Sequence, residues 1–95
     1  MAKSILQDEK KCWFCHSQAG LHEHHIYAGT ARRKISEENG FKVYLCWFHH
    51  NGSAYGVHFN RVNDLLLKRA CQRKYEETGS REDFIKLIGK NYLEE

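Results

Sequence analysis

Two short stretches of this 95-residue chain each place two metal-binding side chains three positions apart. Cys12 and Cys15 begin and end CWFC, and Cys46 and His49 repeat the same gap in CWFH. Tetrahedral zinc takes four nitrogen or sulfur ligands, and two tight turns that offer two ligands each meet this need. The spacing therefore predicts one structural Zn²⁺ that ties the turns together. His50 follows His49 directly and is the alternative fourth ligand.

The size of the chain makes such a staple useful. A chain of 95 residues forms one domain at most, and a domain this small buries a limited core. Zinc binding adds stability because its free energy becomes folding free energy. A Cys12–Cys15 disulfide is the alternative, which a reducing compartment disfavours. Cys71 falls within a helical pattern and is expected to be a small buried side chain.

The N-terminal sequence and the hydropathy favour a cytoplasmic protein. MAKSILQDEKK lacks the apolar core of a signal peptide, and no apolar run is long enough for a membrane span. We therefore expect reduced cysteines and no membrane partner. The net charge of +3 permits nucleic-acid binding without requiring it.

The order of polar and apolar residues predicts an α+β domain whose strands precede its main helices. Residues 1–11 are polar and are expected to form an arm or a frayed helix. The sequences LHEHHIY at 21–27 and FKVYLC at 41–46 are typical of short strands. Between them we expect a loop with a short helix, which has Ser36 as its N-cap and ends at Gly40.

Two helices are predicted in the second half of the chain, after a loop with the sequence WFHHNGSAYG. Between about 57 and 78, apolar side chains recur at three- and four-residue spacing and predict a core-facing stripe. The stripe consists of Phe59, Val62, Leu66 and Ala70, widened by Leu65. The last helix is predicted to begin after Ser80 as its N-cap. Its expected buried side chains are Phe84, Leu87 and Ile88.

Three histidines, His22, His24 and His25, fall within four positions of the first predicted strand. Neutral imidazole is both a metal ligand and a general base. Neighbouring strand residues point to opposite faces, so a joint role of His24 and His25 requires a strand end or a twist. His22 is expected at the surface or behind a metal ligand, and Glu23 is expected to be solvated.

In their order along the chain, these motifs resemble the HNH endonucleases, the ββα-metal nuclease class. The motifs are CWFC at 12–15, HHI at 24–26 and YLCWFHH at 44–50, followed by a helix. The resemblance covers about residues 12–78, and small zinc-stapled phage proteins of this class are the most similar. It implies a ββα-metal core of a hairpin and a helix, to which the C-terminal helix predicted from the residue pattern at 79–95 would be an addition packing on the core.

The same resemblance implies a reaction and roles for the histidines. The reaction is metal-dependent hydrolysis of phosphodiester bonds in DNA, in a bacterial or phage-infected cell. His25 matches the general base that activates water, which an imidazole can do near neutral pH. His24 and His50 match the ligands of a catalytic divalent cation, and His58 is a rival for the second ligand.

The middle asparagine of the motif name has no counterpart at its usual position, where this chain has Phe41. Asn39 and Asn51 are the nearest candidates to orient the base. Imidazole ligands in place of carboxylate favour later transition metals over Mg²⁺. We therefore expect activity with Mn²⁺, Co²⁺ or Ni²⁺ that at least matches activity with Mg²⁺.

Basic residues after the first strand are candidates for DNA contacts. Arg32, Arg33 and Lys34 are consecutive, and arginine binds phosphate in a forked geometry. The basic residues at 68–74 are expected to form a solvated helix face. Trp13 and Trp47 are expected to pack over the zinc site. A protein this small that cuts both strands is a possible homodimer.

Two other function classes stay open at this point. One is a zinc-stapled DNA- or RNA-binding module without catalysis. The other is a structural or protein-interaction domain in which the histidines form one larger metal site. A His25→Ala variant separates the enzyme from the binding module, because the enzyme loses cleavage while keeping its affinity for DNA.

Overall fold

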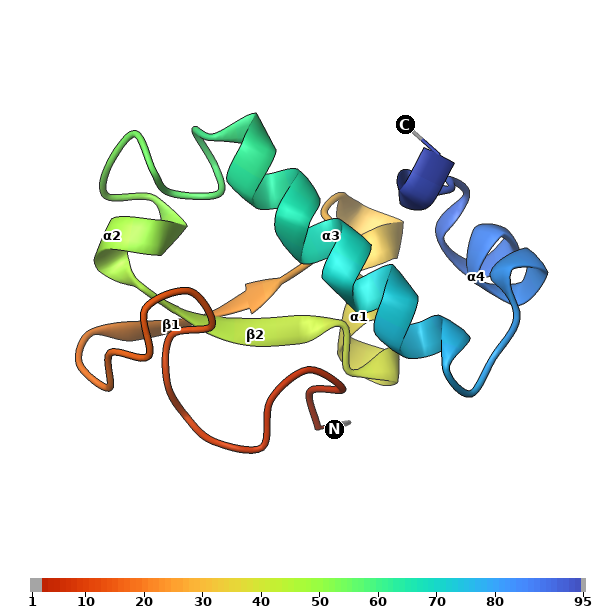
Figure 1. Cartoon of the computed structure of the whole chain (residues 1–95), viewed down its shortest axis with the longest axis horizontal. Helices are drawn as coiled ribbons and strands as arrows, with labels where there is room; N and C mark the ends of the chain where they lie inside the picture. Colours follow the sequence, from red (N-terminus) through yellow and green to blue (C-terminus); the bar gives the residue numbers. More distant parts are fainter. Residues whose placement is uncertain (1–2, 95) are drawn as a thin grey trace.

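The computed structural model describes residues 3–94 as a mixed α/β structure built on one antiparallel strand pair (Figure 1). Along the chain the elements are β1 (Leu21–His25), α1 (Thr30–Asn39), β2 (Lys42–Cys46), α2 (Trp47–His50), α3 (Arg61–Glu76), α4 (Arg81–Ile88) and the 3₁₀ turn η1 (Tyr92–Glu94). Both predicted strands are confirmed. No helix within residues 3–94 combines the length and the apolar character of a membrane span.

The register of the strand pair decides which side chains share a face. Leu21 lies opposite Cys46, and His25 lies opposite Lys42. Since strand side chains alternate, His22 and His24 project from one face, and Glu23 and His25 project from the other. The His24 face also carries the buried Val43 and Leu45, which belong to the hydrophobic core.

The segment between the strands is a full helix, α1, so the prediction of a loop with Ser36 as an N-cap is wrong. Ser36 lies inside the helix and is fully buried. Its hydroxyl donates to the Tyr27 carbonyl at 3.1 Å and accepts from the Tyr27 N–H at 3.3 Å. Those bonds compensate the burial of a polar side chain. Gly40 ends the helix in the left-handed conformation, with φ 73°, as predicted.

The long helix α3 buries a different stripe from the predicted one. Phe59, Val62 and Leu66 are 69%, 68% and 49% exposed, whereas Leu67 and Cys71 are fully buried. Both stripes have helical spacing, so periodicity could not decide which one meets the core. The predicted burial of Cys71 is confirmed.

The last helix and the N-terminal segment complete the packing. Ser80 caps α4 by accepting from the Asp83 N–H at 3.0 Å, as predicted. Phe84 and Ile88 are buried, while Leu87 is partly buried. The part of the N-terminal arm at residues 3–11 contains no helix, and residues 1–2 lie outside the described chain. This segment borders β2, where the Gln7 side chain accepts from the Tyr44 N–H at 2.8 Å.

Candidate metal centres

The two predicted zinc-binding turns meet in space. The ligand atoms of Cys12, Cys15, Cys46 and His49 all lie within 4.8 Å of one another, and we call these residues the Cys₃His cluster. The Cys15 and Cys46 sulfurs are 3.7 Å apart, and the Cys46 sulfur is 3.3 Å from Nδ1 of His49. Sulfurs about 2.3 Å from a tetrahedral zinc lie about 3.8 Å apart. The cluster is therefore compatible with a structural zinc ion, and the fourth ligand is His49.

Short local structure brings these four ligands together. β2 ends at Cys46, and the single turn of α2 returns His49 to the Cys46 sulfur. In the other turn, the His16 N–H donates to the Cys12 carbonyl at 2.8 Å. Burial opposes ionisation of Cys12, but backbone N–H groups of Cys15, Cys46 and Phe14 outweigh it and lower the pKa of the thiol. A lowered pKa favours the thiolate, which is the ligand form.

The aromatic residues next to the cluster ligands in the sequence differ in their exposure and in what they contact. Phe14 stacks on the His49 ring, with centroids 5.2 Å apart. Trp13 is partly buried and packs against the hydrophobic core. Trp47 is 59% exposed, so the prediction that it packs over the zinc site is wrong.

A second group of possible ligands lies on the core face of the strand pair. His24, His50 and His58 have ring nitrogens within 4.8 Å of one another, and we call them the three-histidine cluster. Nε2 of His50 is 3.1 Å from Nε2 of His58. The His24 ring lies 5.3 Å, between centroids, from each of the other two rings. The structure thus brings both rival candidates, His50 and His58, to His24.

One nitrogen of this cluster has no protein partner. Nε2 of His24 is buried and makes no hydrogen bond within the described part of the chain. A buried polar atom without a partner costs free energy, so native proteins rarely leave one. A cation held by the three imidazoles would satisfy this atom. The donor set therefore fits a divalent transition-metal ion.

The electrostatics of the cluster favour the neutral form of His24 and of His50. Burial, followed by repulsion from His50 and His58, lowers the pKa of His24 to about 3. Burial also lowers the pKa of His50, with smaller contributions from His58 and His22. Neutral imidazole is the form that binds metal, so proton competition at these ligands is weak near neutral pH.

Two further features hold His50 and His58 in place. Nδ1 of His22 lies 2.9 Å from Nδ1 of His50, which leaves Nε2 of His50 facing His58. The loop after α2 folds back, so that the His58 N–H donates to the His50 carbonyl at 3.2 Å. Gly56 permits this return, because a Cβ there would lie 2.7 Å from the His50 carbonyl oxygen. His22 therefore contacts a candidate ligand.

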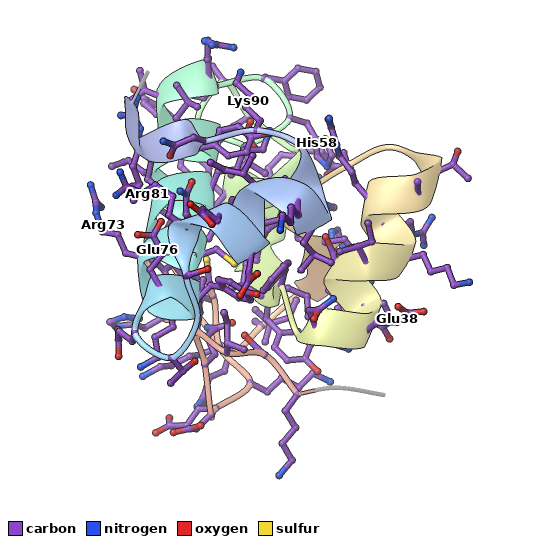
Figure 2. All side chains as sticks on the ribbon, turned by 90° about the vertical axis from the view of Figure 1, so that its right-hand side faces the viewer. Glu38, His58, Arg73, Glu76, Arg81 and Lys90 are labelled. Carbon is purple, nitrogen blue, oxygen red and sulfur yellow. The ribbon has the colours of Figure 1, made fainter. Side chains whose placement is uncertain are left out.

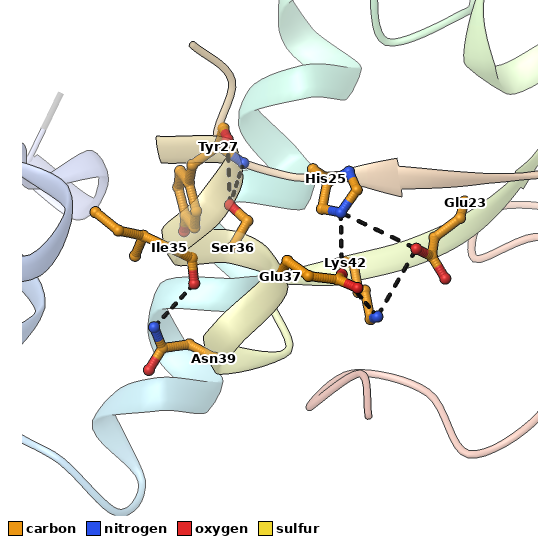
Figure 3. Close-up of polar contacts among 8 residues, drawn as sticks. All are labelled: Glu23, His25, Tyr27, Ile35, Ser36, Glu37, Asn39 and Lys42. Carbon is orange, nitrogen blue, oxygen red and sulfur yellow. Dashed lines mark hydrogen bonds and ion pairs between the residues drawn. The ribbon is translucent and has the colours of Figure 1, made fainter. Parts of the chain in front are cut away.

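His25 lies outside the three-histidine cluster, since its side chain leaves the other face of β1. Its Nε2 is 3.1 Å from Oε2 of Glu37, and Nζ of Lys42 is 2.8 Å from the same oxygen (Figure 3). The Glu23 carboxylate lies 3.7 Å from Lys42 and 4.0 Å from His25. We call these four residues the His25 network. Glu23 is thus part of an ion-pair network, not simply a solvated strand residue.

Neither candidate asparagine contacts His25. The Asn39 side chain donates to the Ile35 carbonyl at 2.8 Å, and Figure 3 shows it turned away from His25. Asn51 is the C-cap of α2, and its backbone N–H points to Trp47. Glu37 occupies the position next to His25 instead. Its residue type suits the contact, but only the packing of α1 against β1 brings it to His25.

The predicted phosphate contacts lie on α1. Arg33 and Lys34 are exposed, and with His25 and Thr30 they line a surface hollow. Arg32 is engaged elsewhere, since its Nε donates to the Ile88 carbonyl at 3.1 Å. The structure therefore places two of the three predicted cations beside His25.

Comparison of the chain with protein-family models, with curated proteins and with solved structures finds no significant match. Any statement about activity therefore depends on the geometry of the two metal-binding clusters and of the His25 network. These clusters bring together residues that are far apart in the sequence, from the first cysteine turn to His58.

Proposed function

We propose that this chain is an HNH-type endonuclease of the ββα-metal class, which hydrolyses phosphodiester bonds in DNA. The observation that carries the proposal is that His24, whose buried Nε2 has no partner, groups with His50 and His58 and directly precedes His25 in the sequence. This hydrolysis requires a cation site and a general base, and consecutive residues at the end of β1 would supply a ligand of the one and the side chain of the other.

The arrangement of the elements supports the fold part of this proposal. β1 and β2 would be the two strands of the ββα core, and α3 would be its helix. The structural zinc would join the chain before β1 to the end of β2 through the Cys₃His cluster. α4 and η1 would be the C-terminal addition to this core.

Each part of the site has a distinct chemical task. His24, His50 and His58 would hold the divalent cation, which supplies Lewis-acid stabilisation of the phosphate and the leaving oxygen. His25 would take a proton from the attacking water at Nδ1, because its Nε2 is engaged with Glu37. Arg33 and Lys34 would contact the neighbouring phosphates.

The position of His25 sets a condition on substrate binding. His24 and His25 project from opposite faces, and His25 is the last residue of β1. The scissile phosphate must therefore lie across the end of this strand, within reach of both sides. Arg33 borders the His25 side of that end.

Cleavage of supercoiled plasmid with a panel of cations tests the proposed metal site. Three imidazoles and no carboxylate form the donor set, so Mn²⁺, Co²⁺ or Ni²⁺ should support nicking at least as well as Mg²⁺. Cleavage that Mg²⁺ alone supports would contradict His24 as a ligand.

A His25→Ala variant tests the role of the base. General-base catalysis contributes about 10²–10⁴-fold, so nicking should fall by that factor while DNA affinity and zinc content stay constant. His16→Asn is a matched control, because His16 is an exposed histidine outside the three clusters and asparagine tolerates its φ of 65°. Equal nicking rates for His25→Ala and the unchanged protein would refute the proposed mechanism.

A second candidate function is a zinc-stapled nucleic-acid-binding module without catalysis. The separation of the His25 side chain from the three-histidine cluster favours it. DNA binding by the unchanged protein, without nicking in any cation, would support this candidate. Metal counting adds a further distinction, because one tight zinc and one exchangeable cation indicate the endonuclease, whereas two tight metals do not.

A further inference from the structure

The His25 network differs from an ordinary surface ion pair in the burial of its lysine and in the number of elements that it joins. Lys42 is only 6% exposed, and its ammonium lies 2.8 Å from Oε2 of Glu37. The same oxygen accepts from Nε2 of His25 at 3.1 Å. β1, α1 and β2 each supply part of the contact, since they carry His25, Glu37 and Lys42 respectively. One carboxylate oxygen thus joins three separate elements at the end of β1.

Lys42 keeps this carboxylate ionised. Its hydrogen bond to Glu37, followed by the one from His25, lowers the pKa of the Glu37 carboxyl. The same contact raises the pKa of the Lys42 ammonium. An ionised carboxylate accepts hydrogen bonds only, so the nitrogen of His25 that faces it must carry the proton. This leaves Nδ1 as the free basic nitrogen of a neutral His25 ring.

The direction of the His25 ring agrees with this assignment. Figure 3 shows the second ring nitrogen pointing away from both carboxylates. Nδ1 of His25 makes no hydrogen bond to any residue between 3 and 94. The ring also borders the hollow that Thr30 and Arg33 line.

We infer that Glu37 is the positioning residue for His25, holding the imidazole with Nε2 protonated and Nδ1 free, and that Lys42 fixes Glu37 in turn. This inference rests on the proposed endonuclease function, in which His25 is the base. It assigns to a carboxylate on α1 the orienting task that the sequence pattern gave to Asn39 or Asn51. A fixed base requires no reorientation when it takes the proton.

A cation site is a different use of the same side chains. Glu23, His25 and Glu37 lie close enough together to hold an ion. The Lys42 ammonium already lies within 4 Å of both carboxylates, at 3.7 Å and 2.8 Å. A cation in this position would have to approach that fixed positive charge at short range. The geometry therefore favours a role in orienting His25 over a role in binding metal.

Glu37→Ala, Glu37→Gln and Glu38→Gln form the test series. Glu38 follows Glu37 on α1 but is exposed and projects from the outer side of the helix (Figure 2), so its variant removes one charge without touching His25. Glu37→Ala removes the acceptor, and kcat for plasmid nicking should fall about 10- to 100-fold with an unchanged KM. Glu37→Gln keeps an acceptor oxygen and should restore part of kcat, while Glu38→Gln should match the unchanged protein.

Nitrogen NMR of the histidine rings provides a readout that does not depend on cleavage. The unchanged protein should show His25 with the proton on Nε2, and Glu37→Ala should show a mixture of both tautomers. Zinc content should stay constant in every variant. Glu37→Ala should melt at a lower temperature, because Lys42 loses its nearest carboxylate, so kcat and the tautomer are compared at a temperature at which every variant is folded. A purely structural role for Glu37 would lower the melting temperature without changing the tautomer of the folded protein.

The outcomes separate this inference from the proposed function. Active Glu37→Ala protein with unchanged kcat and an unchanged tautomer, alongside inactive His25→Ala protein, would overturn the inference and leave the endonuclease standing. Absence of nicking by the unchanged protein under every cation would overturn both. A loss of kcat with the tautomer change, partly restored in Glu37→Gln, supports the inference.

Discussion

The Cys₃His cluster and the three-histidine cluster are two candidate metal-binding groups that differ in donor atoms and in exposure. The first offers four ligand atoms, three of them sulfur, and its Cys12 and Cys46 are buried. The second offers three nitrogen ligands, and only His24 is buried, while His58 is exposed. Structural zinc sites close all four positions with protein, whereas catalytic sites keep a position open. The donor count is thus compatible with different tasks for the two groups, a structural one for the first and, under the proposed function, a catalytic one for the second.

The way in which the chain builds each group strengthens this distinction. Every ligand of the Cys₃His cluster lies in a turn or at the end of an element that zinc itself would brace. The three-histidine cluster shares α2 with the first group, through His50 beside His49, but takes its other two ligands from strand β1 and from the loop held against α2 by the His58–His50 backbone bond. We therefore expect folding to depend on the first group and ligand binding to depend on the second.

Loss of the Cys₃His cluster should have the largest effect. Cys46→Ser, or removal of zinc by a chelator, should unfold the protein, because metal binding at such sites is worth about 10 kcal/mol or more, comparable to the whole stability of a domain. Circular dichroism and zinc content measure the outcome. Cys71→Ala is the control, since Cys71 is buried outside both groups and should keep zinc bound. A folded, zinc-free Cys46→Ser protein would remove the distinction between the two groups.

Loss of His24 should leave the zinc and the fold intact and weaken the binding of a second cation. His24→Leu should lower the affinity for a second cation about 100-fold while zinc remains bound, because it removes the buried ligand. It should also raise the free energy of unfolding of the zinc-loaded protein by about 1–3 kcal/mol, since the buried Nε2 without a partner disappears. Cobalt titration reports the affinity, and urea unfolding reports the stability. A variant that is less stable and still binds the second cation would contradict this reading of the cluster.

A third, smaller effect is expected on the unfolding free energy at acidic pH. The pKa of His24 is about 3 in the folded protein against an ordinary value of 6.5, because burial disfavours its charged form. Below pH 6.5 the unfolded chain binds a proton that the folded chain does not, so the stability falls as the pH falls. At about pH 5.5 this costs about 1.4 kcal/mol in zinc-loaded protein without a second cation. His24→Leu should not lose this stability at low pH. Plots of the unfolding free energy against pH that run parallel for the two proteins would contradict the low pKa of His24.

The contrast between the two groups also explains what the sequence could predict. The candidate zinc ligands lie three positions apart within each turn, so local spacing predicts all four, and the structure groups the favoured His49, not the alternative His50, with the three cysteines. The motif predicts His24 as a ligand, and the structure places it in a group that could hold an ion. His50 and His58 remained rivals because the return of the loop at Gly56 depends on a backbone approach that no spacing shows.

The parts that the sequence missed depend on register or on the choice between faces. Glu37 reaches His25 only because α1 is a full helix, whereas the pattern predicted a short one with Ser36 as its cap. α3 carries two apolar stripes, and the choice of Leu67 over Leu66 was made by the partners across the core. Periodicity describes one element at a time, so contacts between elements lie beyond it.

The smallest effect is expected for a variant at the start of α3, which tests whether the three-histidine cluster depends on the packing around it. The Asn60 side chain caps α3 directly after the His58 loop, accepting from the Asn63 N–H at 3.0 Å. Asn60→Ala should cost about 1 kcal/mol of stability and, by loosening the His58 side of the site, weaken second-cation binding severalfold with zinc retained. Ser80→Ala removes an equivalent cap from α4 and should cost a similar free energy without changing cation affinity. Equal cation affinity in both variants would show that the cluster is insensitive to the start of α3.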